Sequence, residues 1–354
     1  MSFKTAHISM HNHSGMHNAA KSLVGAEQKL GLDSHLVNMH ETSPDVLDSI
    51  ADADIYVAHT HFPNEIKKRA KKNFKLVFPV HGTPEHIFHS AVESGSHGYG
   101  HGDSLMLLMH WLKKADAIVT SWPRHQAILQ TMVDKNTKVN YVEMGVEKDF
   151  WCPGPSDGKW AGSPSVFTAE NCHSIKCPLD LFIAWPFVYE ELPDACLHAC
   201  YLPNDQHRWY FPFVNANGAA YGAHISPLAF HGTALRNVFR SVDAMCGLVR
   251  YGDHNRLSLE ANASGCKTIS YKGNPYSSFW VDEGSQLDIA KQLIAILKGE
   301  VEPRKDKQEV ADISVTAQGM KDIYETVMDK GLMPIKAVAE IPSNGVKDYA
   351  PVLK

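Results

Sequence analysis

The amino-acid sequence predicts an α/β protein with two domains, each built around a parallel sheet. Two observations support this prediction. The chain has 354 residues, more than a single hydrophobic core usually organises. Short apolar runs also alternate with amphipathic stretches, and this alternation is typical of strand and helix units that feed a parallel sheet. The hydrophobic share of 44% supplies enough apolar material for two cores.

The first series of units occupies the N-terminal half of the chain. Apolar residues recur at helical spacing in 18–30, behind a glycine-bearing loop at 13–16. Short apolar or β-branched runs follow at 55–58, 75–80 and 117–120, and each precedes a polar or glycine-containing turn. A strand, a glycine-bearing turn and a helix are therefore expected to open the chain.

A segment rich in Pro, Gly and Ser at 152–165 separates the two series and predicts an interdomain linker. Beyond it we expect strands at 166–169, 195–201, 246–249 and 268–271, and helices at 179–187, 232–242, 256–264 and 313–328. The predicted organisation is an N-terminal domain at 1–155, a C-terminal domain at 163–330 and a tail at 331–354.

Charge and cysteine content narrow the class of protein. The net charge of −5 does not favour general electrostatic binding to nucleic acid. The seven cysteines form no CxxC pair or zinc-ribbon spacing. Residues 1–15 lack the pattern of a secretion signal, and no stretch approaches the ~18 apolar residues of a membrane span. A reduced, cytoplasmic protein is expected.

The segment 248–271 is the most informative for function. It reads as a strand, a polar loop, a short helix that ends before Gly265, and a second strand. A helix that begins after a loop at the carboxyl edge of a parallel sheet points free N–H groups at its ligand, which favours phosphate. Asn255 and Arg256 stand at its start, and Glu260 lies one turn further in, placed to accept hydrogen bonds from a sugar diol.

This segment resembles the retaining family-four glycosyltransferases and their relatives of GT-B type. Residues 260–265, Glu-Ala-Asn-Ala-Ser-Gly, match the second half of the family signature, whereas the first signature glutamate falls on Gly252. The resemblance implies two Rossmann-like domains that face each other across a cleft. It also implies that Glu260 holds the ribose of a nucleotide-sugar donor in the C-terminal domain.

A second match lies in 167–178, where the family places an arginine and a lysine that face the donor diphosphate. Lys176 occupies the lysine position, and Glu170 replaces the arginine. A cation is useful there because negative charge builds on the leaving phosphate oxygen. We therefore expect Lys176 to act in donor binding and catalysis, with Arg256 as the candidate for the missing positive charge.

Weaker matches extend the resemblance along most of the chain, at 114–121 and 142–153. In the N-terminal half, His81 follows an apolar strand, at the place where family members often keep a histidine beside the sugar and acceptor. The resemblance makes His81 a catalytic candidate, although a turn histidine is an equal alternative. Gly15 resembles the family glycine beside which diphosphate and acceptor approach the backbone.

Taken together, the resemblance implies sugar transfer from a nucleotide-sugar substrate without a metal or other cofactor. It also implies retention of configuration, with the leaving phosphate accepting the acceptor's proton. The acceptor, which could be a glycan, a lipid-linked glycan or DNA, is left open. A non-catalytic sugar-nucleotide-binding protein is an alternative, because the family arginine and first glutamate are absent.

Two other readings stay open at this point. Pairs of histidines at His11 and His13, and at His59 and His61, are also typical of metal-dependent hydrolases. A basic run predicts either a solvated helix face or a weak contact with an anionic surface or DNA, the acceptor of phage DNA-modifying α-glucosyltransferases. That run comprises Lys67, Lys68, Arg69, Lys71 and Lys72.

Overall fold

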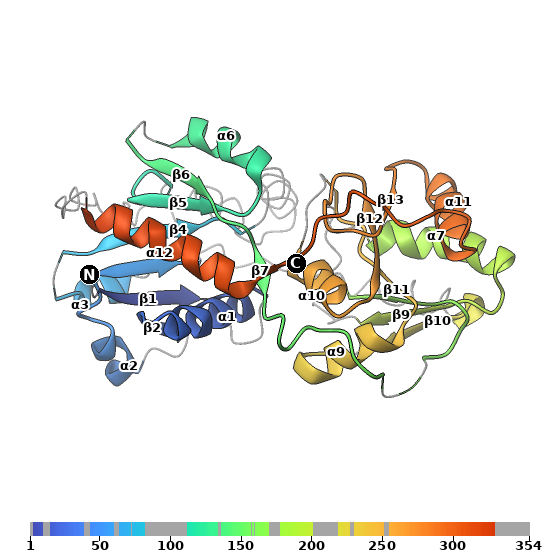
Figure 1. Ribbon diagram of the computed structural model, residues 1–354, viewed down its shortest axis with the longest axis horizontal. Coiled ribbons are helices and arrows are strands. Elements are labelled where there is room, and N and C mark those ends of the chain that lie inside the picture. The colour runs from blue at the N-terminus through green and yellow to red at the C-terminus, as the bar shows by residue number, and fades with distance from the viewer. Residues whose placement is uncertain are drawn as a thin grey trace, which may run out of the picture.

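The computed structural model describes residues 3–9, 15–38, 43–59, 64–71, 73–81, 112–133, 136–156, 158, 160–169, 178–200, 219–226, 230–250 and 255–329. These residues form two α/β units, each built on a six-stranded sheet (Figure 1). The predicted fold class is confirmed. None of the described helices is both long and apolar enough to cross a membrane.

The N-terminal sheet has the strand order β2-β1-β3-β4-β5-β6, and every neighbouring pair is parallel. Its strands are β1 (Lys4–Ser9), β2 (Asp33–Asn38), β3 (Ile55–Ala58), β4 (Lys75–Pro79), β5 (Ala117–Thr120) and β6 (Lys138–Tyr141). Its helices are α1 (Gly15–Lys29), α2 (Pro44–Ser49), α3 (Asn64–Arg69) and α6 (Pro123–Met132). The predicted strands at 55–58, 75–80 and 117–120 correspond to β3, β4 and β5.

Both faces of this sheet are buried, so its strands are apolar along most of their length. Side chains on one face pack against α2, α3 and α6, with Ile8, Tyr56 and Phe78 among them. Side chains on the other face, such as Val57 and Val77, pack against α1 and the last helix of the chain. Because side chains alternate along a strand, residues two positions apart share a face.

The C-terminal sheet has the order β10-β9-β8-β11-β12-β13, again with parallel neighbours. Its strands are β8 (Ser165–Thr168), β9 (Cys196–Cys200), β10 (Ala223–Ser226), β11 (Ala244–Cys246), β12 (Lys267–Tyr271) and β13 (Phe279–Val281). The helices α7 (Pro178–Glu191) and α11 (Gln286–Leu297) cover one face. The helices α9 (Gly232–Ser241) and α10 (Arg256–Ala263) cover the other, and a 3-10 turn spans Ala219–Tyr221.

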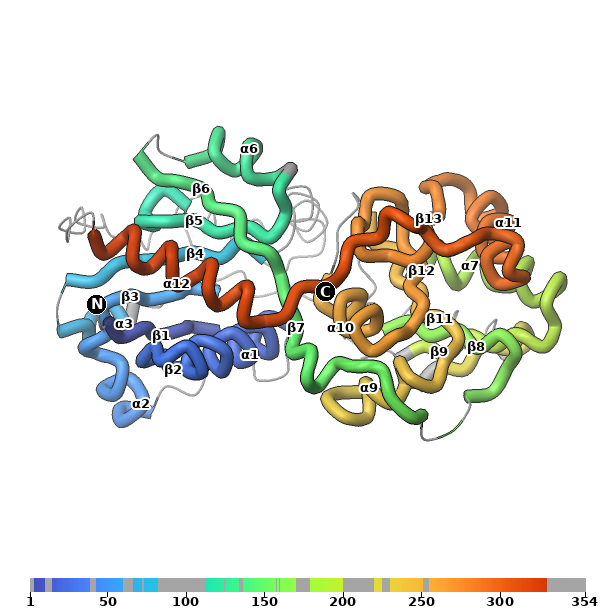
Figure 2. The backbone as a smooth tube through the Cα atoms, viewed as in Figure 1, coloured from blue at the N-terminus to red at the C-terminus, as the bar shows by residue number. Residues whose placement is uncertain are grey.

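The chain crosses between the units twice, and the two crossings lie side by side (Figure 2). On the way out it forms β7 (Gly145–Val146), and on the way back it forms β14 (Ala311–Asp312), which pairs with β7 in parallel. The Thr316 hydroxyl donates to the Glu143 carbonyl and accepts from the Gly145 N–H, each at 2.8 Å. These bonds join the two crossings at one point.

The two cores divide the chain differently from the predicted boundaries. The last helix, α12 (Ile313–Asp329), packs beside α1 on the N-terminal sheet, although the sequence placed 163–330 in the C-terminal domain. The apolar face of α12 is needed there because α1 alone does not cover that face of the sheet. Conversely, Val146 and Trp151 pack in the C-terminal core, within a stretch that the sequence placed in the N-terminal domain.

Gly145 tests the junction between β7 and β14. A Cβ atom at this position would overlap the backbone of Asp312 and Ile313, so Gly145→Ala should push the two strands apart. We expect a loss of about 1–3 kcal/mol in the free energy of unfolding, measured by urea denaturation.

Gly25→Ala is the matched control, because Gly25 lies inside α1 and a Cβ atom there would meet no atom within 4 Å. It should raise the free energy of unfolding by about 0.5–1 kcal/mol, since alanine costs less backbone entropy in a helix. Equal effects of the two substitutions would contradict the assigned role of the junction.

Candidate functional site

Three imidazoles form a line across the carboxyl edge of the N-terminal sheet. His7 lies in β1, His59 directly follows β3, and His81 follows β4. His7 Nδ1 lies 2.9 Å from His59 Nε2, and His59 Nδ1 lies 2.9 Å from His81 Nε2. We call these residues the histidine row. Strand parity brings them together, because His59 and His81 stand two and four positions beyond Val57 and Val77, on the same face.

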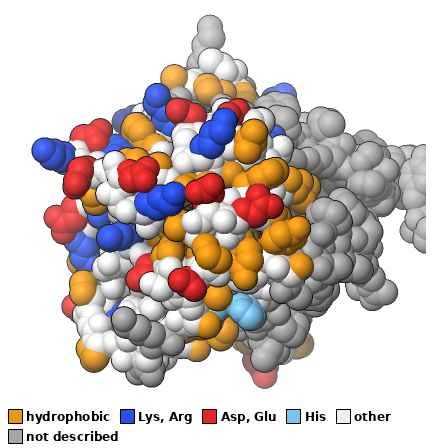
Figure 3. All heavy atoms as spheres, turned by 90° about the vertical axis from the view of Figure 1, so that its right-hand side faces the viewer, with side chains coloured by type: hydrophobic (Ala, Val, Ile, Leu, Met, Phe, Trp, Pro, Cys, Tyr) orange, Lys and Arg blue, Asp and Glu red, His pale blue; other side chains and the backbone are white. Residues whose placement is uncertain are grey.

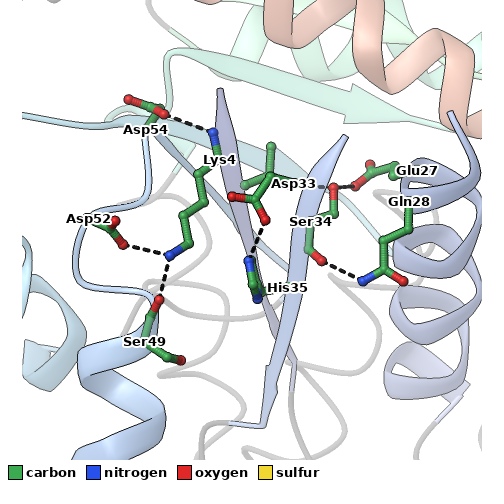
Figure 4. Close-up of polar contacts among 10 residues, drawn as sticks. Lys4, Glu27, Gln28, Asp33, Ser34, His35, Ser49, Asp52 and Asp54 are labelled. Carbon is green, nitrogen blue, oxygen red and sulfur yellow. Dashed lines mark hydrogen bonds and ion pairs between the residues drawn. The ribbon is translucent and has the colours of Figure 1, made fainter. Parts of the chain in front are cut away.

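Glu27 of α1 lies at the inner end of the row. Its Oε2 atom lies 2.9 Å from His7 Nε2 and accepts a hydrogen bond from the Ser34 hydroxyl at 2.7 Å, a contact that Figure 4 shows. Its Oε1 atom accepts from the Tyr324 hydroxyl of α12 at 2.8 Å. The side chains of Glu27 and His7 are completely buried, so the carboxylate depends on these partners rather than on water.

Burial and charge set the ionisation of the row. Burial raises the pKa of Glu27, but His7 and the hydrogen-bond donors around the carboxylate lower it by a larger amount. The pKa of Glu27 therefore lies below its ordinary value of 4.5, and Glu27 is a carboxylate at neutral pH. Burial lowers the pKa of His59 well below its ordinary value, and His81, His7 and His17 add to this effect. Burial also lowers the pKa of His81 to about 4. The outer two imidazoles are therefore neutral at pH 7.

A second polar cluster lies where the two units meet, around Arg256 at the start of α10. The Arg256 guanidinium donates from Nε to Glu260 Oε1 at 2.6 Å and from Nη2 to Glu147 Oε2 at 2.6 Å. Nη2 also donates to the hydroxyl of Ser22 in α1 at 2.7 Å. Arg256 therefore binds two carboxylates and also joins the C-terminal unit to α1.

Glu260, the predicted ribose ligand, is buried on the second turn of α10. Burial raises its pKa to about 7, against the lowering effect of Arg256, and Glu147 adds to the increase. Asn255, another predicted donor ligand, caps α10, because its side-chain oxygen accepts from the Ser258 N–H at 2.9 Å. The predicted helix at 256–264 thus begins where expected, with Asn255 as its cap.

Each sheet has one point at which the strand order reverses, and ligands of parallel α/β sheets bind there. In the N-terminal sheet this point lies between β1 and β3, which the bond between His7 and His59 spans. In the C-terminal sheet it lies between β8 and β11. Thr168 ends β8 there, and its buried hydroxyl has no hydrogen-bond partner within the described part of the chain.

The structure describes some of the other predicted site residues but not all of them. Gly15 is the exposed first residue of α1, and a Cβ atom there would meet nothing within 4 Å. Lys176 and the histidines at 11, 13 and 61 lie outside the described residues. His59, named in the alternative metal site, has both ring nitrogens within hydrogen-bond distance of other imidazoles.

The basic run lies away from the histidine row. Lys67, Lys68 and Arg69 are the last residues of α3, which precedes the first residue of β4 along the chain. His81 instead follows the last residue of β4. Arg69 pairs with Asp48 at 3.0 Å, Lys71 follows this helix, and Lys72 lies outside the described residues. Figure 3 shows the opposite end of the molecule, that of the C-terminal unit, where acidic and basic side chains are intermingled with apolar ones.

His7, Glu27 and Tyr324 were not predicted from the sequence. One signal was available for His7, because Thr5, His7 and Ser9 are polar residues at alternate positions of an otherwise apolar, buried strand. Glu27 and Tyr324 occupy core-facing positions of amphipathic helices, where an ionisable side chain requires a partner.

Comparisons with known proteins concern the fold. No family model and no curated protein matches the chain. Among solved structures, sucrose-phosphate synthase from Thermosynechococcus elongatus aligns with a TM-score of 0.71 and 14% identity, over 93% of this chain and 100% of that one. HepE from Anabaena, in complex with UDP and glucose, aligns with a TM-score of 0.61 and 13% identity, over 92% and 99%.

A glycosyltransferase from Rickettsia africae aligns with a TM-score of 0.57 and 13% identity, over 92% of this chain and 99% of that one. These likenesses span nearly the whole chain and both sheets. The protein therefore has the GT-B fold, as the sequence predicted.

The ionisation of Glu260 leads to a test of the junction cluster. Its folded-state pKa of about 7 lies above the ordinary 4.5, so between these values the folded protein holds a proton that the unfolded chain has lost. The free energy of unfolding should therefore fall as pH rises from 5 to 7.5, with Glu260 contributing up to about 1.4 kcal/mol per pH unit. Glu260→Gln should flatten this dependence in urea denaturation series.

Glu191→Gln is the control, because Glu191 is an exposed residue that pairs with Lys298 on the surface. It should leave the pH dependence as in the wild type. If the curves for wild type and Glu260→Gln ran parallel, the pKa of Glu260 would not be raised.

Proposed function

We propose that this protein is a glycosyltransferase that moves a sugar from a nucleotide-sugar donor to an acceptor. The observation that carries the proposal is the likeness in fold to sucrose-phosphate synthase, which covers 93% of the chain. The likeness to HepE in complex with UDP and glucose supports a nucleotide-sugar as the substrate. The motifs at 260–265 and 167–178 support a relation to the retaining family four.

We place the donor at the reversal point of the C-terminal sheet, between β8 and α10. Thr168 ends β8 with a buried hydroxyl that pairs with no described residue, and Glu260 presents a carboxylate suited to a ribose diol. Arg256 holds Glu260 in place, so its proposed part is to orient the ribose ligand as well as to add positive charge. Lys176 is the proposed cation for the diphosphate, whose charge increases as the glycosidic bond breaks.

We place the sugar and acceptor chemistry at His81, on the carboxyl edge of the N-terminal sheet. Gly15 begins the helix after β1, beside the reversal point of the same sheet, and leaves room for a ligand. Retention follows from the resemblance, and we propose that transfer requires no bound metal. The acceptor remains a glycan, a lipid-linked glycan or DNA.

The remaining proposals concern location and surface contacts. A DNA acceptor or an anionic surface held by the basic run would contact the edge of the sheet opposite to His81, because α3 leads into the start of β4. Four of the described cysteines form no disulfide, which supports the proposed reduced, cytoplasmic environment.

Binding of a nucleoside diphosphate tests the donor site directly. UDP at millimolar concentration, without divalent metal, should raise the thermal unfolding temperature, because a ligand that binds only the folded state stabilises it. Lys176→Ala should weaken UDP binding by roughly 1.5–3 kcal/mol through loss of one charge-assisted contact, measured by calorimetry.

Lys291→Ala, an exposed lysine of α11 in the same domain, is the matched control and should bind UDP as the wild type does. Failure of all four common nucleoside diphosphates to shift the unfolding temperature would contradict the transferase proposal. Equal affinity of wild type and Lys176→Ala would remove Lys176 from the donor site.

His81→Gln tests the acceptor side. It should lower kcat by roughly 10²-fold or more while nucleotide affinity stays nearly unchanged, because a general acid or base acts in the transition state rather than in donor binding. Transfer rates and UDP affinity measured on the same preparation check this. Parallel losses in both would move His81 to the donor site, and unchanged turnover would make it a structural residue.

A further inference from the structure

The hydrogen bonds of the histidine row have a direction that Glu27 imposes. A carboxylate only accepts, so the proton between Glu27 and His7 must lie on His7 Nε2. If His7 is neutral, its Nδ1 is a bare acceptor, and His59 must donate from Nε2. His59 Nδ1 is then bare in turn, so His81 donates from Nε2. His81 Nδ1 is left with a lone pair, and it makes no hydrogen bond to any described residue.

One added proton reverses this whole arrangement. If His7 carries protons on both nitrogens, it donates to His59, His59 donates from Nδ1 to His81, and His81 Nδ1 must carry the outer proton. The two states differ by a single proton. His59 can pass it along the row because its two ring nitrogens lie 2.9 Å from His7 Nδ1 and from His81 Nε2. When His81 Nδ1 gains a proton at the outer end of the row, the resulting positive charge can therefore lie on His7 at the inner end.

The inner end is the place where a positive charge is best stabilised. His7 contacts the ionised carboxylate of Glu27, whereas His59 and His81 have no acidic neighbour among their described contacts. Burial opposes charge on the outer two rings, as the lowered pKa of each shows. Among the described residues, the titratable groups that face the row are Glu27 and His17 of α1 and Tyr324 of α12. A proton therefore gains most by moving inward to His7.

We propose that the histidine row is a proton relay, which takes a proton from a substrate hydroxyl at His81 Nδ1 and stores it on His7 beside Glu27. The proposal rests on the proposed function, which supplies the hydroxyl. It assigns relay roles to His7, His59 and Glu27, residues that lie behind the substrate rather than in contact with it. It also gives the acceptor's proton a destination other than the leaving phosphate.

The step conserves atoms and charge. The acceptor oxygen forms a bond to the anomeric carbon while its O–H bond breaks, and the nucleoside diphosphate leaves with the electron pair of the old glycosidic bond. The proton goes to His81 Nδ1, His81 Nε2 releases its own proton to His59 Nδ1, and His59 Nε2 releases one to His7 Nδ1. At the end His7 is an imidazolium, and the other two imidazoles are neutral with their protons on the opposite nitrogens.

The first test needs no substrate. Protein labelled with ¹⁵N-histidine is titrated by NMR, with the signals of the row assigned through His59→Gln and His81→Gln. The relay requires that one titration changes all three rings at the same pH, with His7 gaining a proton while His59 and His81 exchange tautomers. Rings that titrate separately, or a titration confined to His7, would overturn the proposal. This result does not depend on whether the protein transfers a sugar.

The second test uses the transfer reaction. Glu27→Gln removes the carboxylate. In the profile of kcat/KM against pH, the acid limb should therefore shift to lower pH by about one to three units. In the same variant, kcat should fall by roughly 10²-fold to 10⁴-fold, because the stored charge loses its counter-ion. His59→Gln interrupts the row and should abolish the limb. His35→Gln, an exposed histidine of β2 paired with Asp33, is the control and should keep the wild-type profile.

A purely structural role would lower activity in Glu27→Gln without moving the acid limb, and that outcome would contradict the relay. If neither wild type nor variants transfer sugar but the three rings titrate together, the relay stands and the proposed function fails. If transfer occurs and the rings titrate separately, the proposed function stands and the relay fails.

Discussion

A single buried carboxylate, Glu27, is the constraint on which much of the N-terminal half depends. An ionised group in the interior costs several kcal/mol unless its oxygens are paired. Its partners come from three different elements: His7 from β1, Ser34 from β2 and Tyr324 from α12. The Thr5 hydroxyl extends the network by donating to Ser34 at 2.7 Å. Because each partner must be in place at once, the carboxylate fixes the mutual positions of these elements more strictly than apolar packing alone would.

The junction between the two units uses the same chemistry in a more exposed form. Arg256 is shared by Glu147, Glu260 and Ser22, so α10, the first crossing and α1 meet at one guanidinium. The planar group with several fixed donors suits this task. A change in the ionisation of Glu260 would therefore alter not only the proposed donor contact but also the contact between the units. The proposed donor contact and the contact between the units therefore depend on one side chain.

Sequence reasoning reached the parts of the fold that depend on local pattern. The apolar runs of β3, β4 and β5, the start of α10 at Arg256 and the division into two α/β series all follow from periodicity and turn residues. The return of α12 to the first sheet could not be predicted, because its amphipathic face is equally suited to either core. The candidate site likewise has one part that local pattern predicts and one part that it does not. His81 follows a recognisable strand, whereas its link to Glu27 depends on strand order and on parity across β1, β3 and β4, which no local pattern records.

The position of α12 also has a consequence for the order in which the chain can fold during synthesis. The last strand of the N-terminal sheet, β6, ends at Tyr141, so the ribosome produces all six strands about 180 residues before it produces Tyr324. Until then one face of that sheet is only partly covered, and the Glu27 carboxylate lacks the hydrogen bond from Tyr324. The N-terminal unit therefore cannot complete its core as soon as its own strands have left the ribosome. It can do so only after the C-terminal unit has been synthesised.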